Sequence, residues 1–218
     1  VSPAGVPMWV NGGAHASTSL RQGEVSNPAT GMVIRRVSFA NAEDIDAAVK
    51  AASAALPGWS KAPPLRRARV MQKFLALMQA NQKELAQLVS EEHGKTLPDA
   101  LGSVQRGIEV IEFACGIPHL LKGEYTESAG TGIDVYSMRQ PLGVVAGITP
   151  FNFPAMIPMW MFGVAIACGN TFVCKPSEKD PSVPIRLAEL MVEAGAPPGV
   201  LNVVNGDKVA VDRILEHP

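Results

Sequence analysis

The chain has 218 residues, of which 47% are apolar and 18% charged, and its formal net charge is −1. This balance is that of a globular protein with one large core or two modest domains. It excludes the clustered basic excess of nucleic-acid-binding proteins, so we expect no nucleic-acid partner. The three cysteines form no CxxC pair and the four histidines form no HExxH motif. We therefore predict no metal site, and buried free thiols in a reducing compartment.

Residues 1–40 predict short strands joined by turns. Asn11-Gly12 is a strong hairpin signal, and the run from Asn27 to Gly31 also has turn chemistry. The first residues contain neither a secretory apolar segment nor an Arg-rich amphipathic presequence. We expect a cytoplasmic protein, or one of the mitochondrial matrix if a presequence has been removed.

Two helices are predicted next. Asn41 can cap the first, which has one apolar stripe and ends at Pro57-Gly58. Pro64 opens the second, whose apolar residues recur at helical spacing. We expect the basic residues near its start to form a solvated face: Arg66, Arg67 and Arg69.

Two further helices follow. Asn81 and Glu84 resemble a capping box for a third helix, which stops near Gly94. A longer fourth helix is expected from about Pro98 to Leu121.

The remaining residues divide at about position 143. Residues 124–142 are rich in Gly, Ser and Thr and then alternate, which predicts a small excursion of strands outside the main layers. From 143 onward the pattern is β-α-β-α-β, which predicts a parallel sheet of the α/β class. The expected division is therefore 1–123, 124–142 and 143–218. The series ends after a helix, so we expect a fragment of a longer fold.

A run from Gln140 to Cys174 contains no Asp, Glu, Lys, Arg or His. Three prolines and Asn152 interrupt it well before the ~20 apolar residues that a membrane helix needs, so we expect no membrane association. The run instead predicts a buried strand, a loop, a buried helix and a second strand. The loop would leave the sheet at the carboxyl end of a strand, where α/β sheets bind ligands.

Asn152 is the first candidate for chemistry. Prolines and aromatic residues surround it, and a rigid side-chain amide is the type of donor that an oxyanion hole needs. The alternative is that Asn152 only permits a tight turn and caps the following helix.

Lys175 and Glu178 form the second candidate pair, at the end of the second strand. Glu178 could accept a hydrogen bond from a ribose 2′-hydroxyl and would repel a 2′-phosphate, which favours NAD over NADP. Lys179 adds a further ribose or phosphate contact. The alternative is an ordinary edge lysine with a glutamate that complements a helix N-terminus.

Two familiar nucleotide motifs are not met. Gly94-Lys95-Thr96 has the end of a P-loop, but Val89 stands where its first glycine belongs. No GxGxxG run occurs, so the usual dinucleotide fingerprint is missing.

Longer runs resemble the aldehyde dehydrogenase superfamily. They are PLGVVAGITPFNFPAMIPMWMFGVAIACGNTFVCKPSEKDP, GAPPGVLNVVNG, NPATG and EHGK, which extend over nearly the whole chain. Within the superfamily, the chain is most similar to the CoA-acylating methylmalonate-semialdehyde dehydrogenase branch. Gly163 departs from the pattern, which has a proline there, and we expect only a local effect on the helix.

The resemblance assigns roles to single residues. It places the oxyanion-holding amide on Asn152 and implies NAD as the coenzyme. Residues 124–142 would build a homodimer or homotetramer, and Arg106 is the candidate for the substrate carboxylate, with a surface salt bridge as the alternative. The coenzyme contacts implied are Thr149, Phe151, Lys175, Glu178 and Lys179.

The reaction implied is oxidation of methylmalonate or malonate semialdehyde through a cysteine thioester that is passed to coenzyme A. The nucleophilic cysteine of the family lies outside this chain, since none of the three cysteines matches its motif. Two alternatives remain open: a semialdehyde dehydrogenase that forms the free acid, and a non-catalytic module that binds nucleotide or oligomerises.

Overall fold

A mixed sheet lies at the centre of the structure, a computed structural model that describes residues 4–218. Its strand order is β3-β2-β10-β9-β8. The strands β8 (Val144–Ile148), β9 (Thr171–Lys175) and β10 (Leu201–Val203) are parallel. This confirms the α/β prediction of a parallel sheet for the second half of the chain.

The hairpin of β2 (Met8–Val10) and β3 (Gly13–His15) adds two antiparallel strands to this sheet. Asn11 and Gly12 form its turn with φ of 55° and 77°, the left-handed values of a two-residue hairpin turn. A separate sheet contains β1 (Ala4–Val6), β5 (Met32–Ser38) and β4 (Gln22–Asn27). The expected turn at 27–31 joins β4 to β5, where Gly31 N donates to Asn27 O at 2.8 Å.

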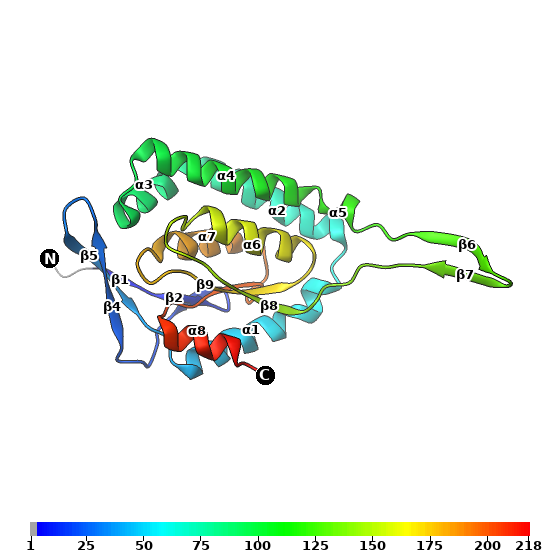
Figure 1. Cartoon of the computed structure of the whole chain (residues 1–218), viewed down its shortest axis with the longest axis horizontal. Coiled ribbons are helices and arrows are strands. Elements are labelled where there is room, and N and C mark those ends of the chain that lie inside the picture. The colour runs from blue at the N-terminus through cyan, green and yellow to red at the C-terminus, as the bar shows by residue number, and fades with distance from the viewer. Residues whose placement is uncertain (1–3) are drawn as a thin grey trace.

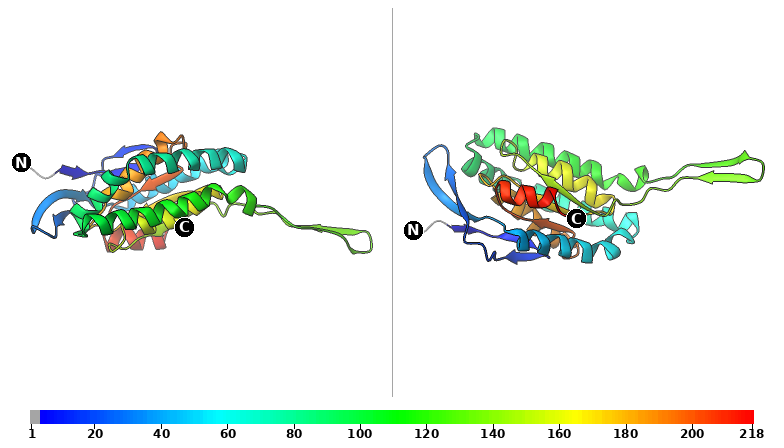
Figure 2. Two further views of the ribbon diagram at one scale, coloured as in Figure 1. Left: turned by 90° about the horizontal axis from the view of Figure 1, so that it is seen from above. Right: turned by 60° about the horizontal axis from the view of Figure 1, so that its bottom comes forward.

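Helices cover both faces of the central sheet (Figures 1 and 2). On one face lie α1 (Ala42–Ser60) and α8 (Lys208–Leu215). On the other lie α6 (Met156–Ala167) and α7 (Ser182–Glu193). The outer layer, which packs on α6 and α7, contains α2 (Pro64–Ala80), α3 (Gln82–His93) and α4 (Leu97–Cys115). Within residues 4–218, no helix is both long and apolar enough to span a membrane.

Two helix boundaries and one helix cap differ from the sequence-based expectation. Helix α1 continues through Pro57 to Ser60, because Trp59 is buried and donates to Ile166 O at 2.9 Å. Asn81 occupies the N-cap position of α3, but its side chain makes no capping hydrogen bond, since its amide donates instead to Leu77 O at the end of α2. The fourth helix ends at Cys115 and is followed by a short α5 (Ile117–Leu120), because Pro118 has no N–H with which to continue the ladder.

Arg67 does not belong to a solvated face. Its side chain is buried, and its guanidinium donates to the carbonyl oxygens of Ala167 at 3.1 Å, Ser60 at 3.4 Å and Ala62. Arg66 and Arg69 are exposed, as expected. Together with Trp59, Arg67 satisfies carbonyl groups at the C-terminal end of α6, which a helix leaves without internal partners.

Gly163 affects more than its own helix. A Cβ atom at this position would lie 2.4 Å from Cδ1 of Ile111 on α4, so the missing side chain makes room for a neighbouring helix. Gly107 of α4 plays the same part for Met159 of α6, whose Cε would lie 2.1 Å from a Cβ there. The crossing of α4 and α6 therefore depends on two glycines, one on each helix.

Residues 124–142 leave the body of the molecule as an arm. Its strands β6 (Tyr125–Gly130) and β7 (Ile133–Tyr136) pair only with each other among the described residues. Figure 1 shows this hairpin projecting far beyond the helices. At its base, Glu124 N donates to Ser137 Oγ at 2.9 Å.

The three cysteines are free, but only Cys174 is fully buried. Cys115 and Cys168 are partly exposed, which corrects the expectation that all three thiols are buried.

Candidate functional site

The candidate site is built where β8 and β9 end side by side. Ile148 of β8 is in register with Lys175 of β9, and Thr149 N donates to Lys175 O at 3.0 Å. The chain then enters the loop 149–155 and begins α6. Because these strands are parallel, both expected groups of site residues leave the same edge of the sheet.

Asn152 lies exposed in this loop, three residues before Ala155, the residue that precedes α6. Ala155 occupies the N-cap, and no side chain caps this helix. The alternative role of Asn152 as a helix cap is therefore wrong. Lys95, between α3 and α4, donates to the backbone oxygen of Asn152 at 2.6 Å. The Asn152 side-chain amide makes no hydrogen bond with other residues of the described chain, 4–218, so it is free to donate to a ligand.

Lys175 is almost fully buried at the end of β9. Its ammonium donates to Gly206 O at 2.9 Å and lies 3.7 Å from a carboxylate oxygen of Glu178. Burial lowers the pKa of Lys175, while the negative charge of Glu178 opposes that shift. Glu178 keeps 39% of its side chain exposed, so its carboxylate remains accessible beside the ammonium.

The hydroxyl of Thr149, directly after β8, is also buried. It lies beside the Cys174 thiol, a weak hydrogen-bonding group, and has no full partner among residues 4–218. The carboxyl ends of two adjacent parallel strands therefore carry three polar groups close together. They are the hydroxyl of Thr149, which lacks a hydrogen-bond partner among residues 4–218, the ammonium of Lys175 and the carboxylate of Glu178. These groups fit the hydroxyls and phosphates of a dinucleotide.

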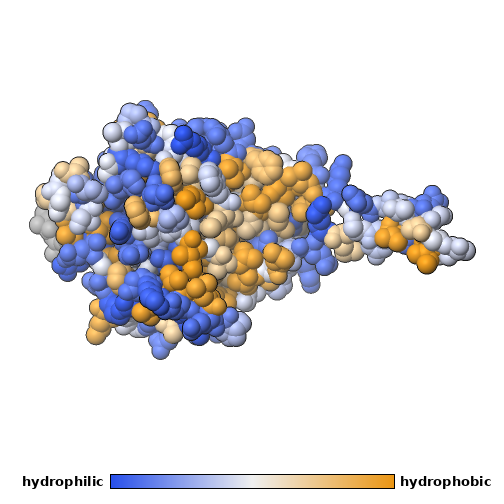
Figure 3. Space-filling model, viewed as in Figure 1, coloured by the Kyte–Doolittle hydropathy of each residue, from blue (hydrophilic) through white to orange (hydrophobic). Residues whose placement is uncertain are grey.

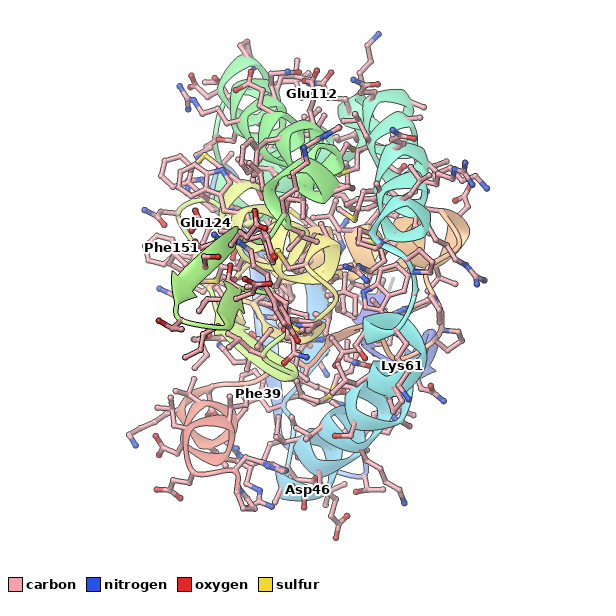
Figure 4. The ribbon with its side chains drawn as sticks, turned by 90° about the vertical axis from the view of Figure 1, so that its right-hand side faces the viewer. Phe39, Asp46, Lys61, Glu112, Glu124 and Phe151 are labelled. Atoms are coloured by element: carbon pink, nitrogen blue, oxygen red, sulfur yellow. The ribbon has the colours of Figure 1, made fainter. Side chains whose placement is uncertain are left out.

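Phe151 contacts both His93 and Lys179. Its ring stacks on His93 at a centroid distance of 6.3 Å, and Lys179 Nζ lies 4.7 Å from its centroid on the neighbouring loop. Figure 4 shows Phe151 at the periphery of the molecule, on the other side of the view from Lys61, which follows α1. A cavity of about 330 Å³ borders Phe151 and Lys179, whereas Thr149, Lys175 and Glu178 do not line it.

Arg106 is exposed on α4 and forms no ion pair within residues 4–218, so the surface salt bridge suggested as its alternative role is not found there. Its positive charge contributes to lowering the pKa of Lys95, whose main cause is burial. Arg106 therefore lies near Lys95, whose ammonium contacts the Asn152 loop.

None of the three cysteines is activated as a nucleophile. Burial raises the pKa of the Cys174 thiol to about 12, and burial likewise raises the pKa values of Cys115 and Cys168. A nucleophilic cysteine needs the opposite shift, toward the thiolate. Within residues 4–218, no group of three or more His, Cys, Asp or Glu side chains is placed to hold a metal ion.

Sequence reasoning missed three residues around this loop. Lys95 belongs to the EHGK run and to an incomplete P-loop match, and neither predicts its bond to the Asn152 backbone. His93 supports the Phe151 ring, and Asp180 lies buried beside the cavity. The signal available for all three was their position in the EHGK and KPSEKD runs, not their spacing.

Comparison with known proteins identifies the family. A model of the aldehyde dehydrogenase family matches residues 15–218. The chain belongs to the aldehyde dehydrogenase family.

Individual members of the family are close. The chain is 54% identical to malonate-semialdehyde dehydrogenase of Pseudomonas aeruginosa over 91% of its own length and 40% of that protein. Malonate-semialdehyde dehydrogenase 2 of Geobacillus thermodenitrificans is 53% identical, with 96% and 42% covered. The chain thus spans about 40% of the length of the curated aldehyde dehydrogenases that it matches.

Solved aldehyde dehydrogenase structures have the same fold. A Sinorhizobium meliloti protein described as a methylmalonate-semialdehyde dehydrogenase, solved with NAD, gives a TM-score of 0.98 at 59% identity, over 100% of this chain and 44% of that one. Methylmalonate-semialdehyde dehydrogenase from Oceanimonas doudoroffii gives 0.95 at 51% identity, over 97% and 43%. The expectation of an α/β fold with a parallel sheet, as part of a longer fold, is confirmed, and that fold is the Rossmann-like coenzyme domain of aldehyde dehydrogenases.

Proposed function

We propose that this chain forms the coenzyme-binding part of an NAD-dependent enzyme that oxidises malonate or methylmalonate semialdehyde. The observation that carries the proposal is that the Asn152 loop and the segment with Lys175 and Glu178 leave adjacent parallel strands at the same edge of the sheet. The names of close relatives supply the substrate class. The reacting cysteine would come from residues outside this chain, because its own thiols have raised pKa values.

In this proposal, Lys175 and Glu178 hold the ribose hydroxyls of NAD, and Thr149, Phe151 and Lys179 line the rest of the coenzyme site. Bound NAD supplies the hydride acceptor for aldehyde oxidation. The free amide of Asn152 donates to the oxygen of the reacting carbonyl as negative charge develops there. Arg106, unpaired within the described chain and near Lys95, is the candidate for the carboxylate end of the semialdehyde.

We further propose that the acyl group is passed to coenzyme A. No residue of this chain carries that step, so its support is the sequence resemblance to the CoA-acylating branch. The three free cysteines suit a reducing, cytoplasmic location. The relatives compared are bacterial, which gives the mitochondrial alternative no support.

The arm at 124–142 is proposed to hold copies of the protein together as a dimer or tetramer. Several of its large apolar side chains are more than half exposed, and a lone two-stranded hairpin is marginally stable in water. Contact with another copy would cover these side chains.

The remaining residues, 1–123 and 143–218, are proposed to form one coenzyme-binding unit in two segments of the chain.

The test of the proposed function is a product assay on the full-length protein that contains this chain. Purified protein is mixed with malonate or methylmalonate semialdehyde and NAD, with and without coenzyme A, and NADH and the acyl product are measured. We expect NADH formation with both substrates, and an acyl-CoA product when coenzyme A is present. No NADH with either semialdehyde would contradict the proposal, and a free acid in the presence of coenzyme A would contradict the acylation step.

A further inference from the structure

Lys95 occupies an unusual place for a lysine on a loop between helices. Helix α3 ends in Gly94, whose φ of +84° and close contact with Pro28 suit only glycine. The Ser90 hydroxyl then donates to Lys95 O at 2.8 Å, and Thr96 caps α4. The backbone around Lys95 is therefore fixed on both sides, and the side chain is directed toward the loop that follows β8.

The Lys95 ammonium is held at three points. It donates to Ser103 Oγ at 3.2 Å and to Asn152 O at 2.6 Å, and it lies 3.9 Å from the centroid of the Phe153 ring. Ser103 is buried on α4. The ammonium thus connects α4 to the Asn152 loop through two neutral oxygens and one aromatic face, although no carboxylate of the described chain pairs with it directly.

The bond from Lys95 is the sole hydrogen bond that the structure gives Asn152 within residues 4–218, whether through its backbone or its side chain. Residues 150–152 otherwise make no backbone hydrogen bond to the described chain. A loop with so few internal bonds depends on outside contacts for its position. Within residues 4–218, the hydrogen bond that locates Asn152 therefore comes from an ammonium on a different segment.

We propose that Lys95 is a positioning residue that fixes the Asn152 amide in its donor geometry by binding the Asn152 carbonyl oxygen. This inference rests on the proposed function, because it assigns Lys95 a part in the oxyanion contact of Asn152. Burial lowers the pKa of Lys95, whereas Asp180 and Asp99 act against that shift. Lys95 need not touch the substrate, the coenzyme or the reacting atoms for this role.

A double-mutant cycle in the full-length protein tests the inference. The variants are Lys95→Met, Asn152→Ala and the two combined, with Lys83→Met as the control because Lys83 is exposed on α3. For each variant, kcat at saturating substrate, KM and the Kd for NAD are measured, and circular dichroism checks folding.

We expect Lys95→Met to lower kcat about 10- to 100-fold, as a donor displaced by about 1 Å would. The Kd for NAD should stay within about twofold of the wild-type value, and the double variant should be no slower than Asn152→Ala alone. Lys83→Met should behave as the wild type. A structural lysine would instead change the Kd for NAD and the stability as much as kcat.

The outcomes separate the two proposals. If Asn152→Ala lowers kcat but Lys95→Met does not, or if their losses multiply, the inference about Lys95 is overturned and the proposed function stands. If Asn152→Ala leaves kcat unchanged, the proposed oxyanion role fails and the positioning role fails with it. Should Lys95→Met not fold, Ser103→Ala removes one anchor of the ammonium, and we expect an approximately 3- to 10-fold lower kcat. An unchanged kcat in a folded Ser103→Ala protein would also overturn the inference.

Discussion

Lys175 and Glu178 form a pair in which one charge is buried and the other is accessible. The ammonium already has a protein acceptor in Gly206 O at 2.9 Å, so its orientation is fixed before any ligand binds. The partly exposed carboxylate of Glu178 can therefore contact a ligand and determine which coenzyme binds. An acidic group at a ribose favours a 2′-hydroxyl over a 2′-phosphate.

Substitutions at this pair should change coenzyme binding. We expect Lys175→Ala to raise the Kd for NAD about tenfold, through loss of about 1.4 kcal/mol of charge-assisted hydrogen bonding. Glu178→Gln should narrow the preference for NAD over NADP. Titration of each variant of the full-length protein with NAD and with NADP measures the two dissociation constants. An unchanged NAD affinity in both variants would exclude the ribose contact.

Asp180 is a second residue whose charge state matters. Burial, together with the nearby charge of Glu92, raises its pKa from 3.8 to about 8. The folded chain therefore binds this proton more tightly than the unfolded chain does. As the pH rises from 3.8 to about 8, the unfolded state releases the proton first, and the contribution of Asp180 to stability falls over that interval.

Asp180→Asn should remove this pH dependence. We expect the free energy of unfolding of the variant to exceed that of the wild type at the alkaline end of the interval, by on the order of 2 kcal/mol. The two proteins should converge below pH 3.8, where the carboxyl of Asp180 is protonated in both the folded and the unfolded state. Urea unfolding at several pH values measures the difference, and parallel curves for the two proteins would contradict the assignment.

At the scale of elements, α6 is held at its C-terminal end by α1 and α2. Arg67 and Trp59 donate to the carbonyl oxygens of Ala167 and Ile166. Because α6 begins directly after the Asn152 loop, these contacts support the site from a distance.

The loop and α6 also expose large apolar side chains. They are Phe151 in the loop, and Trp160 and Met161 on the helix. Figure 3 shows apolar surface gathered on this view of the body and on the arm.

Arg67→Met tests the support of α6. The substitution leaves three backbone carbonyls without their donor, and we expect a loss of about 2–4 kcal/mol in the free energy of unfolding. Arg69→Met, at an exposed position of the same helix, is the matched control and should change stability by less than about 0.5 kcal/mol. Equal effects of the two substitutions would show that the Arg67 contacts contribute little.

The arm is the element whose role is easiest to test alone. Tyr136 is 68% exposed on β7, and an acid placed there should repel an apolar partner surface. We expect Tyr136→Glu to lower the mass of the full-length protein, measured by light scattering, without loss of its helical content. Leu20→Glu places the same charge at a 98% exposed position outside the arm and should leave the mass unchanged. An unchanged mass for Tyr136→Glu would contradict the oligomerisation proposal.

At the scale of the whole molecule, local signals predicted most of the fold. The Asn11-Gly12 turn, the Gly94 helix end and the βαβ series from 143 onward all depend on residues close in sequence. Arg67 and Gly163 could not be predicted, because each is explained by a partner on another helix. Helical periodicity identifies the apolar face of a helix, but not which polar side chain will find buried acceptors on a distant segment.

The candidate site likewise contains one contact that local sequence patterns predict and one that they do not. The pairing of β8 with β9 follows from the strand pattern, and it brings Thr149 and Lys175 together. The contact between Lys95 and Asn152 spans 57 positions and depends on how α4 packs on α6, which sequence spacing does not contain. The roles of the site residues stay predictions until they are measured.

Asn152→Ala in the full-length protein tests the central claim most directly, with Gln72→Ala, at an exposed amide on α2, as the control. The measurement is kcat for semialdehyde oxidation beside the Kd for NAD. We predict that kcat falls about 100- to 1000-fold, as for loss of one oxyanion donor, while the Kd for NAD changes less than about twofold. A kcat equal to that of the control, or an equal loss of turnover and NAD binding, would contradict the account.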